Sequence, residues 1–524
     1  MAIIGIDLAV TSAHKALVVD DRGGSCGGVI SVHSTPEELQ ALLDQALESS
    51  GPQEPVRVVM EATGLAWLPV ANFFRQRGAV VYLVNPRESA DLGKYFKRHA
   101  KSDRRDCAVL ARMPLINPDL KPWRMAGAKH LAGQRLCRQQ DRMTRCMTEC
   151  KNRIRTWETQ FWPGLEEAVG DPFSPWMRRF RQEWYDPWLL ASADPKRLAA
   201  WLSEAGVRYQ EVDGLAARLQ VVARRCMGTM GTREGDKSPD FDYSYLQCEV
   251  LRELGFLAAF EAQERPIREQ IRGLYRAVHP SRNLESIPGI GEQSASVFVF
   301  FVHDVKRFGS QGEFRAWTGM IPRSSQSSNV EKKGLRLTQA GPSLVKAYAY
   351  LCAESARRWD PQIAAIYYDQ MVNKGKHHTQ AVCACATHLM DRVRTVLRED
   401  KPYELRDVDG RPVSKKEARE IIAERYTVPD AVRQQTNQRA RKAREEKREE
   451  DKEKRRSRRR TKGADVGTSP QPGQASPPPY LCILPQYPGA VKCPRPARPH
   501  ESPASTGYSV VKVPYKEPTP LDMT

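Results

Sequence analysis

The first 115 residues alternate between short β-branched runs and helix-like patterns, and this order is the strongest constraint on the fold. Three apolar runs come first, and helical patterns then alternate with two further apolar runs. Such an order predicts a mixed sheet covered by helices. The predicted strands span residues 2–10, 14–21, 27–33, 56–64 and 79–86, and the predicted helices span residues 34–51, 65–78 and 101–113.

Composition and periodicity divide the rest of the chain. We expect an α/β domain over residues 1–125, a helical or coiled-coil linker domain over 126–280 and a mostly helical C-terminal domain over 281–400. Residues 401–462 are predicted to form a basic charged helix or arm, because 439–462 hold 14 basic and 6 acidic residues with almost no apolar stripe. Residues 463–524, rich in proline, serine and glycine, are predicted to be disordered.

A narrow apolar stripe runs along the first part of the linker domain at helical three- and four-residue steps. It is typical of a coiled coil or a long hairpin helix, or of a helix that docks on the protein's own core. The residues of the stripe are Leu136, Met143, Met147, Cys150, Ile154 and Trp157.

The formal net charge of +19 indicates a polyanionic partner, nucleic acid before membrane. No apolar run is long enough to cross a bilayer, and the N-terminus lacks a basic leader before an apolar core, so we expect a cytoplasmic protein without a membrane partner. The cysteines show no CxxC pair. A group of histidines and cysteines between His377 and His388 is a weak candidate for a metal site, since small buried cysteines on a helix explain it equally well.

Four acidic residues of the α/β unit lie at the ends of two predicted strands and on one predicted helix. Asp7 ends the first predicted strand and Glu61 the fourth, while Asp103 and Asp106 lie one helical turn apart. A surface ion-pair cluster with Lys101, Arg104 and Arg105 is the simpler explanation for the last two acids. All four acids at one sheet edge would instead repel one another unless a cation lay between them, and oxygen ligands favour Mg²⁺ or Mn²⁺. This order of strand and helix acids is the layout of RNase H-like nucleases.

A PGIG turn lies between two predicted helical segments within residues 283–301, the layout of a helix-hairpin-helix. Backbone N–H groups of such a turn can bind a phosphate without reading sequence. Gly289 and Gly291 are therefore candidate nucleic-acid-binding residues.

Five stretches together resemble the DEDD-type insertion-sequence transposases, the IS110 family of bridge-RNA-guided recombinases. They are "GID", "MEATG", "AKSDRRDCAVLA", "PGIG" and "GMIPRSSQSSNVEKKGLRLTQAGPSLVK", and the resemblance covers roughly residues 1–400 in the family's order. It implies a RuvC-like domain whose four acids are Asp7, Glu61, Asp103 and Asp106, followed by a coiled coil and a C-terminal transposase domain.

The resemblance further implies a serine nucleophile in the stretch "SSQSSN". Ser327 is the first candidate, and Ser328 competes because it stands where the family commonly has glycine; Ser324 and Ser325 are weaker candidates. From spacing alone, a flexible polar loop explains this stretch better. Basic residues around the loop are candidates for holding a DNA phosphate, as are those beside the acids. These basic candidates are Arg323, Lys332, Lys333 and Arg336 near the serine, and Lys101, Arg104 and Arg105 near the acids.

The activity implied is excision and insertion of a mobile element through a covalent phosphoserine link, with Mg²⁺ at the acids. A noncoding bridge RNA would pair with donor and target double-stranded DNA, and a homo-oligomer, dimer or tetramer, would assemble the site in a prokaryotic, nucleoid-associated complex. Two alternatives remain open. One is a metal-dependent junction nuclease that hydrolyses DNA without a covalent intermediate, and the other is a non-catalytic nucleic-acid-binding descendant.

Overall fold

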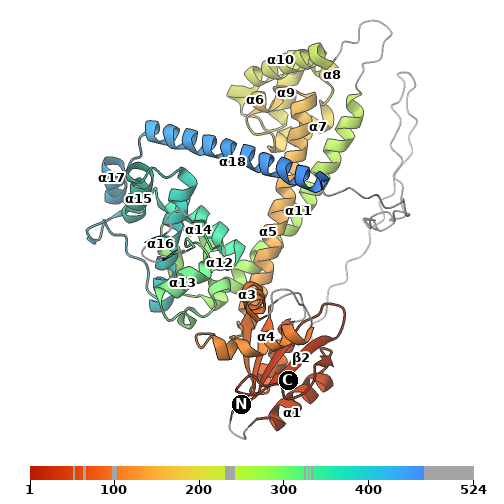
Figure 1. Ribbon diagram of the computed structural model, residues 1–524. Coiled ribbons are helices and arrows are strands. Elements are labelled where there is room, and N and C mark those ends of the chain that lie inside the picture. The colour runs from red at the N-terminus through yellow and green to blue at the C-terminus, as the bar shows by residue number, and fades with distance from the viewer. Residues whose placement is uncertain are drawn as a thin grey trace, which may run out of the picture. The chain divides into compact units, whose positions relative to one another are not determined.

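The computed structural model describes residues 1–50, 54–62, 67–96, 103–230, 242–323, 326–327, 330–331, 335–338 and 340–464. The chain divides into two compact units, residues 1–446 and 447–524. Helices dominate the described residues, with one five-stranded sheet near the N-terminus (Figure 1). No helix in the described ranges is long and apolar enough to span a membrane. The predicted disordered tail lies outside the described residues from position 465 onward.

The N-terminal domain contains the predicted mixed sheet. Its strands are β1 (Ile3–Asp7), β2 (His14–Val19), β3 (Ile30–Val32), β4 (Arg57–Glu61) and β5 (Val80–Val84), in the order β3-β2-β1-β4-β5. The first three form an antiparallel meander, and β1, β4 and β5 are parallel. The predicted mixed sheet is confirmed, and it is consistent with an RNase H-like domain.

Helices cover both faces of this sheet because its central strands are apolar on both sides. Ile4 and Ile6 of β1 belong to the core beneath α1 (Pro36–Glu48) and α2 (Trp67–Gln76), while Ile3 faces the core beneath α4 (Asp103–Ile116). We did not predict α3 (Pro86–Phe96), a short helix whose segment is polar on average and follows β5 directly.

The linker domain is helical, as expected, and consists of α5 (Ala128–Phe161), α6 (Leu165–Val169), α7 (Pro175–Glu183), α8 (Pro187–Ser192), α9 (Pro195–Glu204), η1 (Tyr209–Glu211), α10 (Val212–Met230) and α11 (Tyr243–Val278). The helices α5 and α11 pack along each other in opposite directions, since Gln140 Nε2 donates to Glu264 Oε1 at 2.7 Å and Arg153 pairs with Glu253 at 3.2 Å. The apolar stripe of α5 thus packs within its own chain, as a hairpin helix.

A buried ion pair ties α5 to α7. The guanidinium of Arg181 is fully buried and donates to both carboxylate oxygens of Glu158, at 2.7 and 2.8 Å, and to the carbonyl oxygen of Pro172 at 2.7 Å. Tyr185 also donates to Glu158, at 3.3 Å. Burial, followed by the nearby Glu158 carboxylate, raises the pKa of Tyr185 well above its ordinary value.

We expect Arg181→Met to destabilise the protein by about 3–5 kcal/mol, because it leaves the Glu158 carboxylate buried without a cation. Urea unfolding followed by circular dichroism measures the loss. Arg179→Met is the matched control, since Arg179 lies on the same helix in a partly exposed pair with Glu183 and should cost less than about 1 kcal/mol. Equal losses for the two variants would contradict the assignment of Arg181 as a structural ion.

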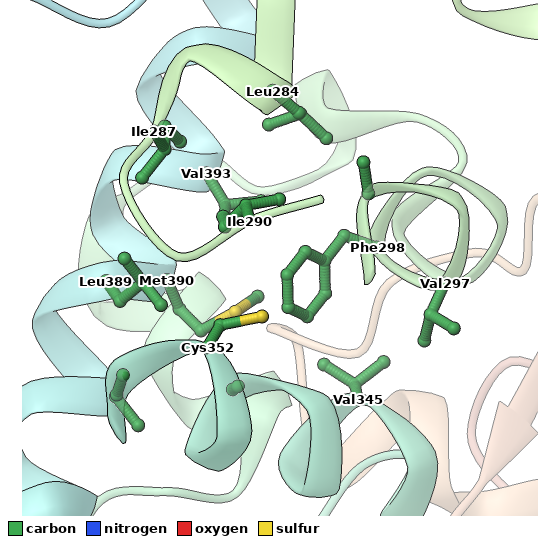
Figure 2. Packing of buried hydrophobic residues seen from close by; sticks show 14 of the residues in the cluster. Leu284, Ile287, Ile290, Val297, Phe298, Val345, Cys352, Leu389, Met390 and Val393 are labelled. Carbon is green, nitrogen blue, oxygen red and sulfur yellow. The ribbon is translucent and has the colours of Figure 1, made fainter. Parts of the chain in front are cut away.

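The C-terminal domain is built around one large apolar core (Figure 2). Nearly every residue of α12 is buried, so this helix forms the centre of the domain. The domain contains the following elements. In chain order they are η2 (Asn283–Ser286), α12 (Glu292–Val302), η3 (Val305–Arg307), α13 (Gln311–Thr318), β6 (Gln326–Ser327), β7 (Val330–Glu331), α14 (Ser343–Ala356), α15 (Pro361–Tyr368), η4 (Asp369–Asn373) and α16 (His378–Glu399).

This core extends beyond residue 400, where we predicted the domain to end. Tyr403, Val428 and Val432 pack with it, and Thr436 is buried. The predicted boundary is therefore too early, because sparse apolar residues among many charges do not reveal a docked segment. Two helices follow, α17 (Lys415–Arg425) and α18 (Asp430–Ala464), and the second contains the predicted basic helix.

Candidate nucleic-acid cleavage site

Two of the predicted acids end neighbouring parallel strands. The register of β1 and β4 pairs Ile6 with Met60, so Asp7 and Glu61, the next residue of each strand, lie at the same edge of the sheet. Both side chains are partly exposed. The carboxyl edge of β1 and β4 therefore carries two partly exposed carboxylates; we call it the carboxylate edge.

The close approach of α4 brings the other two acids toward this edge. A Cβ atom on Gly5 would lie 2.1 Å from the carbonyl oxygen of Cys107 and 2.6 Å from the amide nitrogen of Ala111, so only glycine lets the helix backbone rest on β1. The Cys107 thiol donates to the carbonyl oxygen of Lys15 at 3.0 Å, and Lys15 pairs with Asp7. The N-terminal turn of α4 thus lies at the carboxylate edge.

Asp103 and Asp106 both belong to that turn. The side chain of Asp106 is partly exposed, and that of Asp103 lies outside the described residues. Arg104 is exposed and Arg105 partly exposed on the same turn, whereas Lys101 lies outside the described residues.

We expect Gly5→Ala to destabilise the N-terminal domain by about 3 kcal/mol, because the added methyl group meets helix backbone that cannot rotate away. Gly28→Ala is the control, since its Cβ would meet nothing within 4 Å. Thermal unfolding of both variants tests the prediction. A Gly5→Ala protein as stable as the control would show that α4 can move away from β1 at little cost.

Sequence reasoning missed Ser89 of α3. Its hydroxyl makes a short hydrogen bond to Glu61 Oε1, lies 3.1 Å from the carbonyl oxygen of Pro86, and is buried. This contact holds one oxygen of the Glu61 carboxylate in place. The only signal in the sequence was a serine shortly after a strand.

The carboxylate edge has the donor chemistry of a divalent-cation site, since carboxylate oxygens are the ligands that Mg²⁺ prefers. Among the side chains that the structure describes, no group of three His, Cys, Asp or Glu lies close enough to hold one metal ion. This holds for the histidines and cysteines of α16 as well. There, the Tyr367 hydroxyl and His378 Nδ1 lie 2.8 Å apart, and burial raises the pKa of the Cys385 thiol to about 12.

The candidate serine lies on a short hairpin between α13 and α14. Ser327 of β6 pairs with Val330 of β7, and nearer the base Arg323 donates its N–H to the carbonyl oxygen of Arg336 at 2.9 Å. Both arginines are exposed. Ser328, Lys332 and Lys333, together with Ser324 and Ser325, lie outside the described residues.

Arg323 and Arg336 sit opposite each other on this hairpin, because the adjacent residues Pro322 and Leu337 form a bridge. Side chains that are directly opposite start from the same face, and like charges in this position destabilise a strand pair. A phosphate between the two guanidinium groups would remove that repulsion.

The two candidate glycines of the PGIG turn have different surroundings. A Cβ on Gly289 would lie 2.5 Å from the carbonyl oxygen of Cys352, so this residue allows the turn to pack on α14. Figure 2 shows the neighbouring Ile287 and Ile290 in the same core as Cys352. Gly291 is exposed at the start of α12, and its N–H donates to Ser294 Oγ at 3.0 Å. Phosphate binding by this turn stays a prediction.

Two family models match the chain. One, described as a transposase and named for DEDD transposases of the IS110 type, covers residues 4–163; the other, the transposase IS116/IS110/IS902 family, covers residues 281–368. The first range contains the four acids, and the second contains the PGIG turn and the serine hairpin.

Three similar proteins include two named for insertion elements and one named as a putative transposase. The insertion element IS110 uncharacterized 43.6 kDa protein of Streptomyces coelicolor is 28% identical over 49% of this chain and 61% of its own length. The insertion element IS116 uncharacterized 44.8 kDa protein of Streptomyces clavuligerus is 23% identical over 76% of this chain and 95% of its own length. The putative transposase y4pF/y4sB of Sinorhizobium fredii is 29% identical over 18% of this chain and 24% of its own length.

Proposed function

Because the chain belongs to the IS110 family of transposases, we propose that it cuts and rejoins DNA to excise and insert its own mobile element. The observation that carries this proposal is the carboxylate edge. There, the parallel register of β1 and β4 supports the pairing of Asp7 with Glu61, and the contact of α4 with Gly5 supports a place nearby for the helix that carries Asp103 and Asp106.

Asp7, Glu61, Asp103 and Asp106 would hold Mg²⁺, with Mn²⁺ as a substitute. When bound, such an ion stabilises the negative charge that develops on a phosphate during cleavage. Ser89 would keep Glu61 in one orientation through its hydrogen bond, and this is the role of a second-layer partner at many metal sites.

Ser327 would be the nucleophile. Its Oγ forms a bond to a DNA phosphorus, the bond from that phosphorus to one deoxyribose oxygen breaks, and the serine proton ends on the released deoxyribose oxygen. The covalent link keeps the energy of the broken phosphodiester, so rejoining needs no further cofactor. Arg323 and Arg336 would bind the phosphate, because their guanidinium groups can share its oxygens and lose their mutual repulsion.

The acids and the serine belong to different domains, so a complete site would need both to meet, either within one chain or across a dimer or tetramer. Donor and target double-stranded DNA would be the substrates. A noncoding bridge RNA would supply sequence recognition while the protein binds backbone, in keeping with the net charge of +19. We place this activity in the cytoplasm of a prokaryote, at the nucleoid.

The test is a denaturing gel for protein covalently joined to DNA. The protein is co-expressed with the DNA that flanks its gene, so that any guide RNA is present, and is then incubated with junction DNA and Mg²⁺. The proposal expects a protein–DNA adduct that disappears with EDTA and returns with Mn²⁺. Cut DNA with no adduct at any time point would identify a hydrolytic nuclease instead. Salt-sensitive binding without strand breakage would identify a non-catalytic binding protein.

A further inference from the structure

The hairpin that carries Ser327 rises from two ends that are fixed against each other. A Cβ on Gly319 would lie 1.9 Å from the carbonyl oxygen of Ala340, and a Cβ on Gly341 would lie 1.9 Å from the carbonyl oxygen of Trp317. Both glycines have a φ of +70°, which other residues rarely adopt. We call residues 319–341 the serine hairpin, and its ends the first foot (319–321) and the second foot (340–341).

Lys346 of α14 holds the second foot through exposed hydrogen bonds. Its ammonium group donates to the carbonyl oxygen of Ala340 at 2.9 Å and lies 3.3 Å from that of Gly341. The lysine is in the first turns of α14, directly after the fully buried Val345 of the C-terminal core (Figure 2). Its backbone is therefore fixed, and partial burial lowers the pKa of its ammonium group.

A second helix holds the first foot. Thr387 of α16 donates its hydroxyl to the carbonyl oxygen of Met320 at 3.2 Å and also lies 3.1 Å from the carbonyl oxygen of Cys383. The feet are thus bonded to α14 and α16, two helices that pack on each other in the core.

Backbone hydrogen bonds carry the position of the feet toward the catalytic residues. Thr338 donates its N–H to the carbonyl oxygen of Ile321 at 2.9 Å, and the next pair along the hairpin is Arg323 with Arg336. Beyond it, β6 and β7 pair at Ser327 and Val330. A shift of one foot would therefore move the arginine pair and displace the serine.

Resting on the proposed function of Ser327, we infer that Lys346 is a positioning residue for the nucleophile. It holds the second foot of the serine hairpin on α14 and so sets where the hydroxyl and the arginine pair meet the DNA phosphate. Errors of about 1 Å in such a position lower reaction rates by about 10²-fold.

Lys346→Met tests the inference, because it keeps the length of the side chain and removes the three donors. Two measurements are made on the full-length protein. Without DNA, trypsin cleavage after Arg323 and Arg336 should become several-fold faster, as peptide mapping shows. With saturating DNA, the rate of adduct formation should fall about 10- to 10²-fold, while the affinity for DNA stays unchanged.

Matched variants separate positioning from general damage. Lys346→Arg should show the trypsin cleavage rate and the adduct rate of the unaltered protein, since a guanidinium can donate to both carbonyl oxygens. Lys374→Met should alter neither, because it removes a lysine of the same domain that pairs with Asp369 at 2.6 Å. Thr387→Val removes the hydrogen bond to the first foot and should change the trypsin cleavage rate and the adduct rate in the same direction, but less. This variant tests the inference if Lys346→Met fails to fold.

The outcomes distinguish this inference from the proposed function. Unchanged trypsin cleavage in Lys346→Met, or faster cleavage with an unchanged rate of adduct formation, overturns the positioning role. A different result separates the two ideas. If trypsin cleaves Lys346→Met faster and Lys346→Arg at the normal rate, Lys346 does hold the serine hairpin. If the unaltered protein also forms no adduct, Ser327 is not the nucleophile.

Discussion

Asp7→Asn is expected to abolish DNA cleavage, with a loss of about 10³-fold or more in the rate of strand breakage. The substitution keeps the shape of the side chain and removes a negative charge from the carboxylate edge, where Glu61 and the first turn of α4 would share the same cation. Because a negative charge near the DNA is lost, affinity for DNA should be equal or higher. Cleavage of junction DNA is measured as a function of Mg²⁺ concentration, with binding measured separately in Ca²⁺.

Asp44→Asn is the matched control for this prediction. Asp44 is an exposed carboxylate of α1 in the same domain and accepts a hydrogen bond from Gln40, so its loss should leave cleavage within about twofold. Full cleavage by Asp7→Asn at ordinary Mg²⁺ concentration would show that Asp7 is not a metal ligand. Cleavage recovered only at high Mg²⁺ concentration would instead show that Asp7 binds the ion with help from the remaining acids.

Ser327→Ala is expected to eliminate the protein–DNA adduct, with a loss of about 10⁴-fold or more in strand exchange. A nucleophile that forms a covalent bond cannot be replaced by its neighbours, and removing one lowers rates by several powers of ten. DNA binding should be retained, because Arg323 and Arg336 are untouched. Time courses on denaturing gels, with mass spectrometry of the DNA-linked peptide, measure the effect.

Two serine variants complete this experiment. Ser324→Ala should form the adduct at the normal rate, since that residue is a weaker candidate. An adduct that survives Ser327→Ala and disappears in Ser328→Ala would keep the chemistry and move it by one residue. Strand cleavage that survives both substitutions, without any adduct, would leave water as the nucleophile.

The sheet and most helices followed from sequence because their signals are local. Short β-branched runs specify the five strands, and the parallel pairing of β1 with β4 then places Asp7 beside Glu61. The helix α3 was not predicted because its segment is short and polar on average, and such a helix depends on tertiary packing for its stability. The predicted end of the C-terminal domain was too early because only scattered residues beyond it, such as Val428 and Val432, pack on the core.

The details of the candidate site depend on contacts between distant residues, and no local pattern encodes these. The sequence does not distinguish Gly5 from other strand glycines; its role depends on the contact with α4. Likewise, the role of Ser89 depends on its hydrogen bond to Glu61. The same is true of Lys346, whose partners are backbone carbonyl oxygens and carry no sequence signature. The sequence supplied the acids and the serine segment as candidates; the residues that contact them became visible only in the three-dimensional packing.

The paired helices α5 and α11 join two separate hydrophobic cores. The start of α5 and the end of α11 pack in the C-terminal core, through residues such as Cys137 and Tyr275, while their other halves pack in the linker core, through Ile154 and Leu257. The helical lobe between them is therefore a modular insertion that leaves and re-enters the domain at adjacent points. Such a lobe can change in size without rebuilding the C-terminal core, because the two helices leave and re-enter that core side by side.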